Sequence, residues 1–439
     1  MYRTALQSCM YLIRLFIRNL LKKALILSFN KTSIATTILK NRLNLFSVIA
    51  VFIFASCASK KETGIVNNID AVLKASSNQY LYLGSRNPEG RFPKSYHVKN
   101  DSLETSDSGW WCSGFYPGTL LLLNEANANP KLVALANKSL LDLEKEQYNK
   151  TTHDLGFMMY CSFGNAERQH PDAKYKSILL NSAKSLATRY NSNAKCIQSW
   201  DAAPWNHVAK NEMPVIIDNM MNLELLFWAY RQSGDKTFYD IAINHANTTM
   251  ANHFRADYSS FHEVVYDKDT GKVVRQITNQ GAADASAWAR GQAWGLYGYV
   301  VMYRETKDEK YLIQAQKIAD FILSHPNLPA DKIPYWDFNA PGIPNALRDS
   351  SAAAIIASAL IELGGYSNNV LAKKYYAGAE TMLNSLMSPD YFAAPKTNGG
   401  FLLKHGVGNM PNKTEVDTPL SYGDYYFIEA LTRYKKAGL

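Results

Sequence analysis

The sequence has few cysteines and lacks the spacings at which cysteine or histidine residues bind metal. Only five cysteines occur in 439 residues, and the three that follow Cys57 are widely separated, without a CxxC pair. No HExxH motif is present, and His245 and His253 stand eight positions apart. Disulfide frameworks and zinc sites both show closer, patterned spacing. The sequence therefore predicts a protein whose chemistry uses no metal and no cofactor.

Acidic residues are missing from the first 56 residues, which carry eight Lys and Arg residues. These eight account for all but one unit of the formal net charge of +9, so the rest of the chain is nearly neutral. A nucleic-acid-binding protein carries its positive charge clustered on a folded face. The charge distribution therefore argues against a nucleic-acid partner.

The basic leader contains an apolar stretch, residues 43–54, that is too short to cross a bilayer comfortably. It follows Lys40 and Arg42 and ends at the small residues before Cys57, as a secretory signal does. The pattern resembles a bacterial lipoprotein signal with Cys57 as the lipid-bearing residue, although Phe54 stands where Leu is usual. An uncleaved anchor helix is the alternative. We expect residues 1–56 to be a leader and residues 57–67 a tether, with the protein in the bacterial periplasm or anchored to a membrane through Cys57.

Residues 68–439 are expected to form a single domain that is mostly helical, because apolar residues recur at helical spacing between Gly, Pro or Asn breaks. Helices are predicted over residues 68–83, 114–126, 130–147, 155–167, 173–190, 214–232, 236–253, 283–306, 309–325, 350–363, 370–386 and 422–434. Residues 261–277 are the exception, because β-branched residues flank Asp269-Thr270-Gly271 and predict a β-hairpin.

Twelve helices in adjacent pairs predict an all-α fold, an (α/α)6 barrel in which six hairpins close into a toroid with a small β-hairpin insert. An open helical solenoid is the alternative, but no internal sequence repeat is visible. In a closed toroid, one end collects the loops and helix ends that can line a pocket. The sequence makes no prediction about oligomeric state.

A carboxylate lies within the apolar run of residues 214–230. Asp218 and Asn222 stand four positions apart, so they would share one face of a helix and be shielded by apolar neighbours. Shielding raises the pKa of an acid, and a carboxylic acid that is protonated near neutral pH can serve as a general acid. The same pattern also fits a core aspartate that only ties helices together.

Asp154 is a second acid of interest, because it precedes an apolar run and is well placed to cap a helix N-terminus. If Asp154 also lies near Asp218, the two acids push their pKa values apart, which leaves one protonated and one ionised. Capping and catalysis are both open from the sequence.

Arg290 and Trp294 stand four positions apart, with Tyr297 three further on, so the three would share a helix face. A guanidinium beside aromatic rings suits an anionic sugar, and it equally suits a cation–π contact between packed helices.

Trp111, Trp200 and Tyr422 belong to aromatic clusters that are typical of carbohydrate sites and of protein interfaces alike. His262, at the start of the hairpin, fits a proton shuttle or a surface residue.

Five ordered motifs carry a specific resemblance. They are HDLGF at 153–157, IIDNMMNLELLFWA at 216–229, FH at 261–262, QGxADxSxWARGQAWGLYG at 280–298 and YGDYYFIEAL at 422–431. Together they resemble the unsaturated glucuronyl hydrolases of glycoside hydrolase family 88, over nearly the whole chain after the leader.

The resemblance implies an (α/α)6 barrel that removes 4,5-unsaturated uronic acids from the non-reducing end of oligosaccharides left by polysaccharide lyases. It implies that Asp218 is the general acid and base, which protonates C4 of the vinyl ether so that water adds at C5. Asp154 matches the family's second essential aspartate, which is ionised and steadies the sugar hydroxyls and the developing cation. The resemblance also places in the pocket Trp111, Trp200, His262, Gln280, Arg290, Trp294 and Tyr422.

Two alternatives follow from the same residues. An unsaturated rhamnogalacturonyl hydrolase would share the fold and the chemistry but take pectin fragments. A lipid-anchored glycan-binding protein would need the aromatic residues but not two shielded carboxylates.

Overall fold

The computed structural model describes residues 65–439 except 204, 205 and 207. The predicted leader, Cys57 and the tether up to residue 64 lie outside the described residues. Residues 65–439 belong to one compact unit. Within this part of the chain, no helix combines the length and the apolar character that a membrane span requires.

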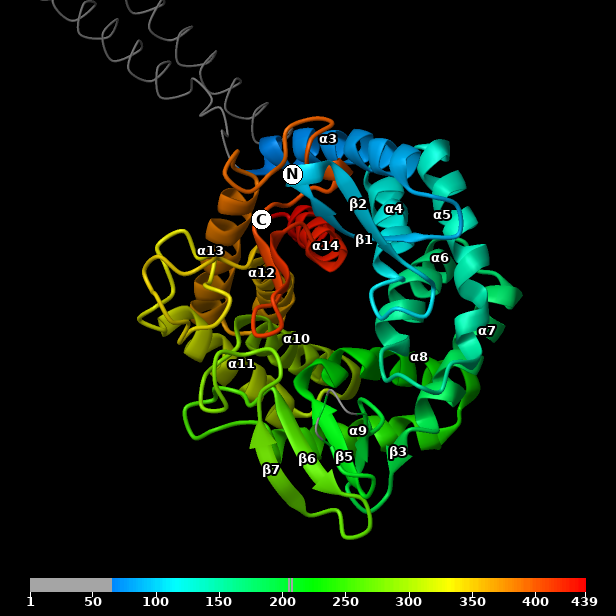
Figure 1. Cartoon of the computed structure of the whole chain (residues 1–439), viewed down its shortest axis with the longest axis vertical. Coiled ribbons are helices and arrows are strands. Elements are labelled where there is room, and N and C mark those ends of the chain that lie inside the picture. Colours follow the sequence, from blue (N-terminus) through cyan, green and yellow to red (C-terminus); the bar gives the residue numbers. More distant parts are fainter. Residues whose placement is uncertain (1–64, 204–205, 207) are drawn as a thin grey trace, which may run out of the picture. The chain divides into compact units, whose positions relative to one another are not determined.

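The helices of this unit form two concentric rings (Figure 1). The outer ring contains α3 (Ile65–Arg86), α5 (Pro130–Leu143), α7 (Ala173–Ala187), α9 (Lys236–Asn252), α11 (Glu309–Ser324) and α13 (Asn369–Leu386). The inner ring contains α4 (Phe115–Ala126), η3 (Gly156–Gly164) with α6 (Asn165–Gln169), η4 (Ile217–Asn222) with α8 (Leu223–Ser233), α10 (Ala289–Thr306), α12 (Ser350–Tyr366) and α14 (Ser421–Ala437). Because α14 packs against both α12 and α4, the inner ring is closed, and the predicted (α/α)6 barrel is confirmed over the open solenoid.

Burial separates the two rings. The inner helices α10 and α12 are buried along nearly their whole length, whereas the outer helices α11 and α13 bury one face only. Most outer helices begin with an Asn or Asp side chain that accepts a hydrogen bond from the backbone two residues on: Asn129, Asp172, Asp235, Asp308 and Asn368. Such caps satisfy the free N–H groups of the first turn, so the outer helix starts are set by local sequence.

The segment predicted as one helix over 214–232 has three parts, which corrects the prediction. Glu212–Ile216 is a strand, β5, that pairs antiparallel with β6 (Glu263–Asp267), and Ile217–Asn222 is a 3-10 helix, η4, before α8 begins. Asp218 and Asn222 therefore lie on a 3-10 turn. Pairing with a distant strand outweighs helix periodicity here, since β-branched Val215 and Ile216 suit a strand.

The predicted hairpin is confirmed as β6 and β7 (Val273–Ile277), and β5 extends it to a three-stranded sheet. Three further two-stranded sheets were not predicted: β1 (Phe92–His97) with β2 (Ser102–Ser106), β3 (Tyr190–Asn191) with β4 (Cys196–Ile197), and β8 (Gly406–Asn409) with β9 (Thr414–Thr418). The helix predicted from 283 begins only at Ala289, because Ser286 donates a 2.6 Å hydrogen bond to Asp337 and belongs to a loop.

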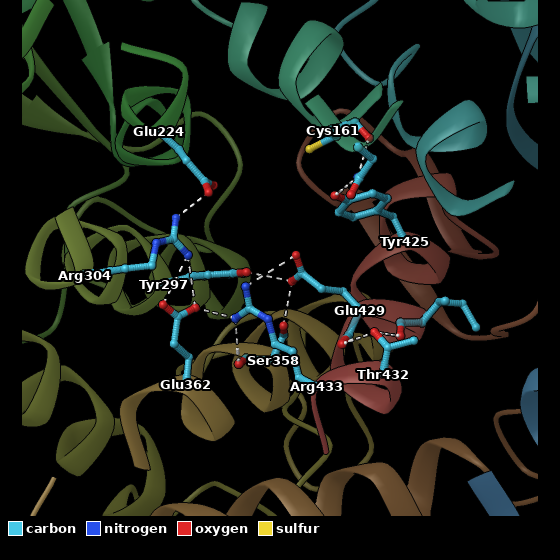
Figure 2. A network of polar contacts seen from close by, with 12 residues as sticks. Cys161, Glu224, Tyr297, Arg304, Ser358, Glu362, Tyr425, Glu429, Thr432 and Arg433 are labelled. Atoms are coloured by element: carbon cyan, nitrogen blue, oxygen red, sulfur yellow. Dashed lines mark hydrogen bonds and ion pairs between the residues drawn. The ribbon is translucent and has the colours of Figure 1, made fainter. Parts of the chain in front are cut away.

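A network of charged side chains joins the four inner helices α8, α10, α12 and α14 (Figure 2). Arg304 of α10 pairs with Glu224 of α8 and with Glu362 of α12, and Arg433 of α14 pairs with the same Glu362 at 2.6 Å. Tyr297 donates a 2.7 Å hydrogen bond to Glu429 in this network. These side chains, except Glu362, line a cavity of about 310 Å³. The network therefore ties neighbouring inner helices together around a polar interior.

Candidate active site

The beginnings of all six inner helices meet at one end of the barrel. Trp111 precedes α4, Asp154 precedes η3, Asp218 lies in the first turn of η4, Arg290 in the first turn of α10 and Tyr422 in the first turn of α14, while Asp349 caps α12. Helix N-termini carry partial positive charge and unpaired N–H groups. Their convergence favours a negatively charged ligand at this end of the barrel.

Asp218 is an acid at this end whose pKa lies far above its ordinary value. Its side chain is almost fully buried, and its Oδ2 atom has no hydrogen-bond partner. Burial raises the pKa of Asp218 to about 7, Arg290 opposes that rise, and the nearby charge of Asp154 adds to it. The structure thus places Asp154 and Arg290 close enough for their charges to act on Asp218, and it leaves the Asp218 carboxyl able to hold a proton near neutral pH.

Asp154 is buried and close enough to Asp218 to raise its pKa, and its side chain does not cap the helix that follows it, so the capping alternative is excluded. Thr152 donates a 2.7 Å hydrogen bond to Asp154 Oδ2, and His153 Nε2 lies 3.2 Å from Asp154 Oδ1. The cap is supplied by a distant residue, because the Phe157 N–H donates to Asn222 Oδ1 at 3.0 Å. The Asp154 carboxylate is therefore oriented by its immediate neighbours and free of a capping role.

Arg290 is buried and its guanidinium is held on several sides. One terminal nitrogen lies 3.2 Å from Asp349 Oδ2, and the two terminal nitrogens also donate to the carbonyls of Val407 and Gly408. Its cation–π partners are the rings of Trp288 and Tyr422, at 4.4 and 5.2 Å. Trp294, predicted on the same face, is buried and lies 5.0 Å from the ring of Phe157, centroid to centroid. Tyr297 turns instead into the charged network of Figure 2.

Aromatic rings form one wall of the site. The ring of Trp111 lies 4.9 Å from that of Tyr422 and 5.6 Å from that of Phe157, so residues from three different inner segments meet here. Trp111 is half-buried, whereas Tyr422 is fully buried. Such a partly exposed ring offers an apolar face to a sugar.

His262 immediately precedes β6 and lies against the ring of Trp288, which also packs on Arg290. Its Nδ1 atom accepts a 2.9 Å hydrogen bond from the Asn279 N–H, so Nε2 carries the ring proton and is left without a partner. Burial is the main cause that lowers the pKa of His262 to about 3, which keeps the ring neutral. Trp200 and Trp288 flank it, with ring centroids 6.2 and 4.9 Å away. His262 is therefore a neutral donor in the interior and not a surface residue.

Gln280 lies half-buried in the loop between β7 and α10. Asp337 anchors this loop by accepting a hydrogen bond from the Ala282 N–H.

Several polar atoms at this end are buried without a hydrogen-bond partner. They include Asp218 Oδ2, His262 Nε2, Arg290 Nε and Tyr422 Oη. Native interiors rarely leave such groups unpaired, because each costs about 1–3 kcal/mol. Their concentration between an aromatic wall and a buried acid fits a polar ligand that supplies the missing partners.

Three residues of the site were missed by the sequence analysis. Asp349 gave only the signal of a helix cap before Ser350, and it also pairs with Arg290 of the neighbouring inner helix. Trp288 stands inside the motif around Arg290, and His153 precedes Asp154 in the HDLGF motif. The motif positions were visible, but their contacts depend on segments far away in the chain.

A closed ring of helix hairpins with an acid pair and an aromatic wall at the helix N-termini defines the six-hairpin class of glycoside hydrolases. No protein-family model matches the chain. It is 47% identical to the "Unsaturated glucuronyl hydrolase" of Formosa agariphila, over 78% of this chain and 84% of that protein. It is 33% identical to the "Unsaturated chondroitin disaccharide hydrolase" of Streptococcus agalactiae, over 84% of this chain and 91% of that protein.

Among solved structures, the fold is similar to that of an "unsaturated glucuronyl hydrolase specific for heparin", with a TM-score of 0.80 and 44% identity. The match covers 84% of this chain and 97% of that one. The chain belongs to the unsaturated glucuronyl hydrolases of glycoside hydrolase family 88, and it is an enzyme of that type.

Proposed function

We propose that this enzyme removes the 4,5-unsaturated uronic acid from the non-reducing end of oligosaccharides that lyases release from glycosaminoglycans. Support comes from its relatives, whose names refer to unsaturated glucuronyl, chondroitin disaccharide and heparin-specific hydrolysis. One observation carries the proposal at the level of the site. The Asp218 carboxyl is buried, lacks a partner on Oδ2 and has a pKa raised to about 7, as proton donation to carbon requires.

The proposed reaction begins with transfer of the Asp218 proton to C4 of the vinyl ether, which leaves positive charge shared by C5 and the ring oxygen. The resulting Asp218 carboxylate takes a proton from water while the water oxygen bonds to C5. The acid is thereby regenerated and a C5 hemiketal forms. The bond from C5 to the ring oxygen then breaks to give a ketone, and the C1 hemiacetal that remains releases the aglycone.

Asp154 and the helix N-termini have complementary roles in this proposal. The Asp154 carboxylate stabilises the developing cation and accepts hydrogen bonds from sugar hydroxyls. The uronate carboxylate faces the positive ends of the inner helices and the field of Arg290, whose terminal nitrogens are already engaged by protein acceptors. Arg290 therefore contributes mainly charge, with Nε as its free donor.

The aromatic and amide residues complete the proposed pocket. Trp111 and Trp200 offer ring faces to the sugar, and His262 Nε2–H offers a neutral donor. Gln280, Trp294 and Tyr422 are proposed as further substrate contacts on the strength of the family motifs.

The test follows the ultraviolet absorbance of the unsaturated sugar, which disappears when C4=C5 is hydrated. The enzyme would be incubated with lyase-generated disaccharides of chondroitin, hyaluronan, heparin and pectin. We expect absorbance to fall with at least one glycosaminoglycan disaccharide. Loss with the pectin product alone would favour a rhamnogalacturonyl hydrolase, and unchanged absorbance with all of them would overturn the proposal.

We also propose that the mature protein is a lipoprotein or periplasmic enzyme. The support is the arrangement of Lys40, Arg42, the apolar stretch and Cys57 in the leader. In this location the enzyme would meet oligosaccharides after extracellular or periplasmic lyases have acted.

A further inference from the structure

Two buried hydrogen-bonded links join the segment that carries Asp154 to the segment that carries Asp218. In the first, the Phe157 N–H donates to Asn222 Oδ1 at 3.0 Å. In the second, Ser199 Oγ accepts a 3.0 Å hydrogen bond from the Ile216 N–H and lies 3.4 Å from His153 Nδ1. Each link spans residues that are far apart in the chain.

The links bracket both carboxyl groups. His153 immediately precedes Asp154, and Phe157 follows it by three positions. On the other segment, Ile216 lies two positions before Asp218, and Asn222 lies four positions after it. The two segments and the two links therefore form a frame, which we call the aspartate frame, with one carboxyl on each long side.

The second link runs through the His153 ring, which stands between Ser199 and Asp154. Burial lowers the pKa of His153, so the ring is neutral and carries one proton. Its Nδ1 atom lies 3.4 Å from Ser199 Oγ, and its Nε2 atom lies 3.2 Å from Asp154 Oδ1. The His153 ring is therefore close to one oxygen of the Asp154 carboxylate, and Thr152 donates to the other, Oδ2.

The aspartate frame has little room to shift. Asn222 and Ser199 are fully buried, and His153 is 1% exposed. A Cβ atom on Gly156 would come within 2.5 Å of the Asn222 Cα, so the two backbones are in direct contact. A buried N–H that loses its acceptor cannot regain a hydrogen bond from water, so breaking either link is unfavourable.

We propose that Asn222 and His153 are positioning residues that hold the carboxyl groups of Asp154 and Asp218 at a fixed separation during the reaction. The inference rests on the proposed function, because it assigns both carboxyls to one reaction. Neither residue is proposed to touch the reacting atoms.

The separation matters because the charge of Asp154 helps to keep Asp218 protonated. Arg290 and Trp294 from α10 and the backbone at Asp218 lower the pKa of Asp218, and Asp349 of α12 and Glu415 of β9 face Arg290 in turn. His262 of β6 is neutral. If the frame loosens, Asp154 can move away while Arg290 stays, so the pKa of Asp218 falls.

The experiment measures kcat/KM against pH for the wild type, Asn222→Leu, Asn222→Ser, His153→Leu and His153→Asn. Because the reaction needs protonated Asp218, activity declines as pH rises through its pKa. We expect a lower midpoint of this decline in Asn222→Leu, Asn222→Ser and His153→Leu, with kcat reduced by about 10- to 100-fold. His153→Asn keeps an amide near the Nδ1 position, and so retains the Ser199 link and a midpoint closer to that of the wild type.

The matched control is Asn165→Leu, which removes a buried amide that bonds Cys161 and Tyr425 outside the aspartate frame. It should lower thermal stability without moving the midpoint. Midpoints unchanged in all frame variants that fold would overturn the inference while leaving the proposed function intact. An inactive wild type would instead overturn the proposed function. Amide hydrogen exchange of wild-type Phe157 gives a check that needs no variant, since exchange as fast as in a free peptide would exclude the first link.

Discussion

The guanidinium of Arg290 and the carboxylate of Asp349 form an ion pair at 3.2 Å in which both side chains are almost completely excluded from solvent. Asp349 also accepts hydrogen bonds from the N–H and the hydroxyl of Ser351 at the start of α12. The pair thus joins the beginnings of two inner helices, and it places a fixed positive charge beside Asp218.

Removing Arg290 is therefore expected to affect both stability and pH dependence. Arg290→Met leaves Asp349 buried without its partner, which costs about 3–5 kcal/mol of unfolding free energy in urea denaturation. Because Arg290 lowers the pKa of Asp218, any remaining activity should decline at a higher pH than in the wild type. The double variant Arg290→Met/Asp349→Asn should recover part of the lost stability, and a double variant less stable than the single one would contradict the role of the pair.

Asp218→Asn is expected to abolish turnover while disaccharide binding survives. The amide cannot donate a proton to C4, and loss of a general acid costs about 10²- to 10⁴-fold in rate. Turnover is followed by ultraviolet absorbance and binding by calorimetry. Asp240→Asn, on the exposed face of α9, serves as the control and should retain full activity. A glycan-binding protein would be indifferent to both substitutions.

The wild-type pH profile should show a decline in kcat/KM centred near pH 7. Asp218 must be protonated in the free enzyme, and its pKa is raised to about 7, chiefly by burial. Activity is therefore retained below this value and lost as the pH rises through it. A profile that stays level up to pH 9 would contradict the assignment of Asp218 as the acid.

Gly114→Ala should destabilise the barrel by about 1–3 kcal/mol through overpacking. A Cβ atom at Gly114 would lie 2.2 Å from the Met158 carbonyl oxygen, where α4 meets η3. The matched control is Gly365→Ala near the end of α12, whose Cβ would meet nothing closer than 3.9 Å. Since Ala is a better helix former, the control should be about 0.5–1 kcal/mol more stable than the wild type, as measured by thermal or urea unfolding.

Cys57→Ala is expected to remove the membrane attachment of the protein expressed in a bacterial host. The wild-type protein should fractionate with membranes and carry the extra mass of a lipid, whereas the variant should lose both. Cys161→Ala, which changes a cysteine of the folded unit, should leave attachment unchanged. A wild-type protein without added lipid mass would contradict lipidation at Cys57.

Much of the barrel could be predicted from the sequence because helix formation is largely local. Apolar spacing and the Asn or Asp caps mark the outer helices, as at Asn129 and Asp308. The burial of Asp218 could be predicted in the same way, because its apolar neighbours are adjacent to it in the sequence. The boundaries failed where distant segments intervened, as when β6 paired with residues 212–216 and made a strand of a predicted helix start.

The sequence by itself determined the twelve helical segments, the shielded position of Asp218 and the motifs that mark the family. Only the tertiary structure decided which partners the site residues have. Arg290 meets Asp349 and the carbonyls of Val407 and Gly408, and Asn222 takes the capping role that Asp154 seemed placed to fill. The physical reason is that the spacing of apolar residues shows which face of a helix or strand is buried. The side chains that this face contacts are set by closure of the helix ring, which brings together residues separated by much of the chain.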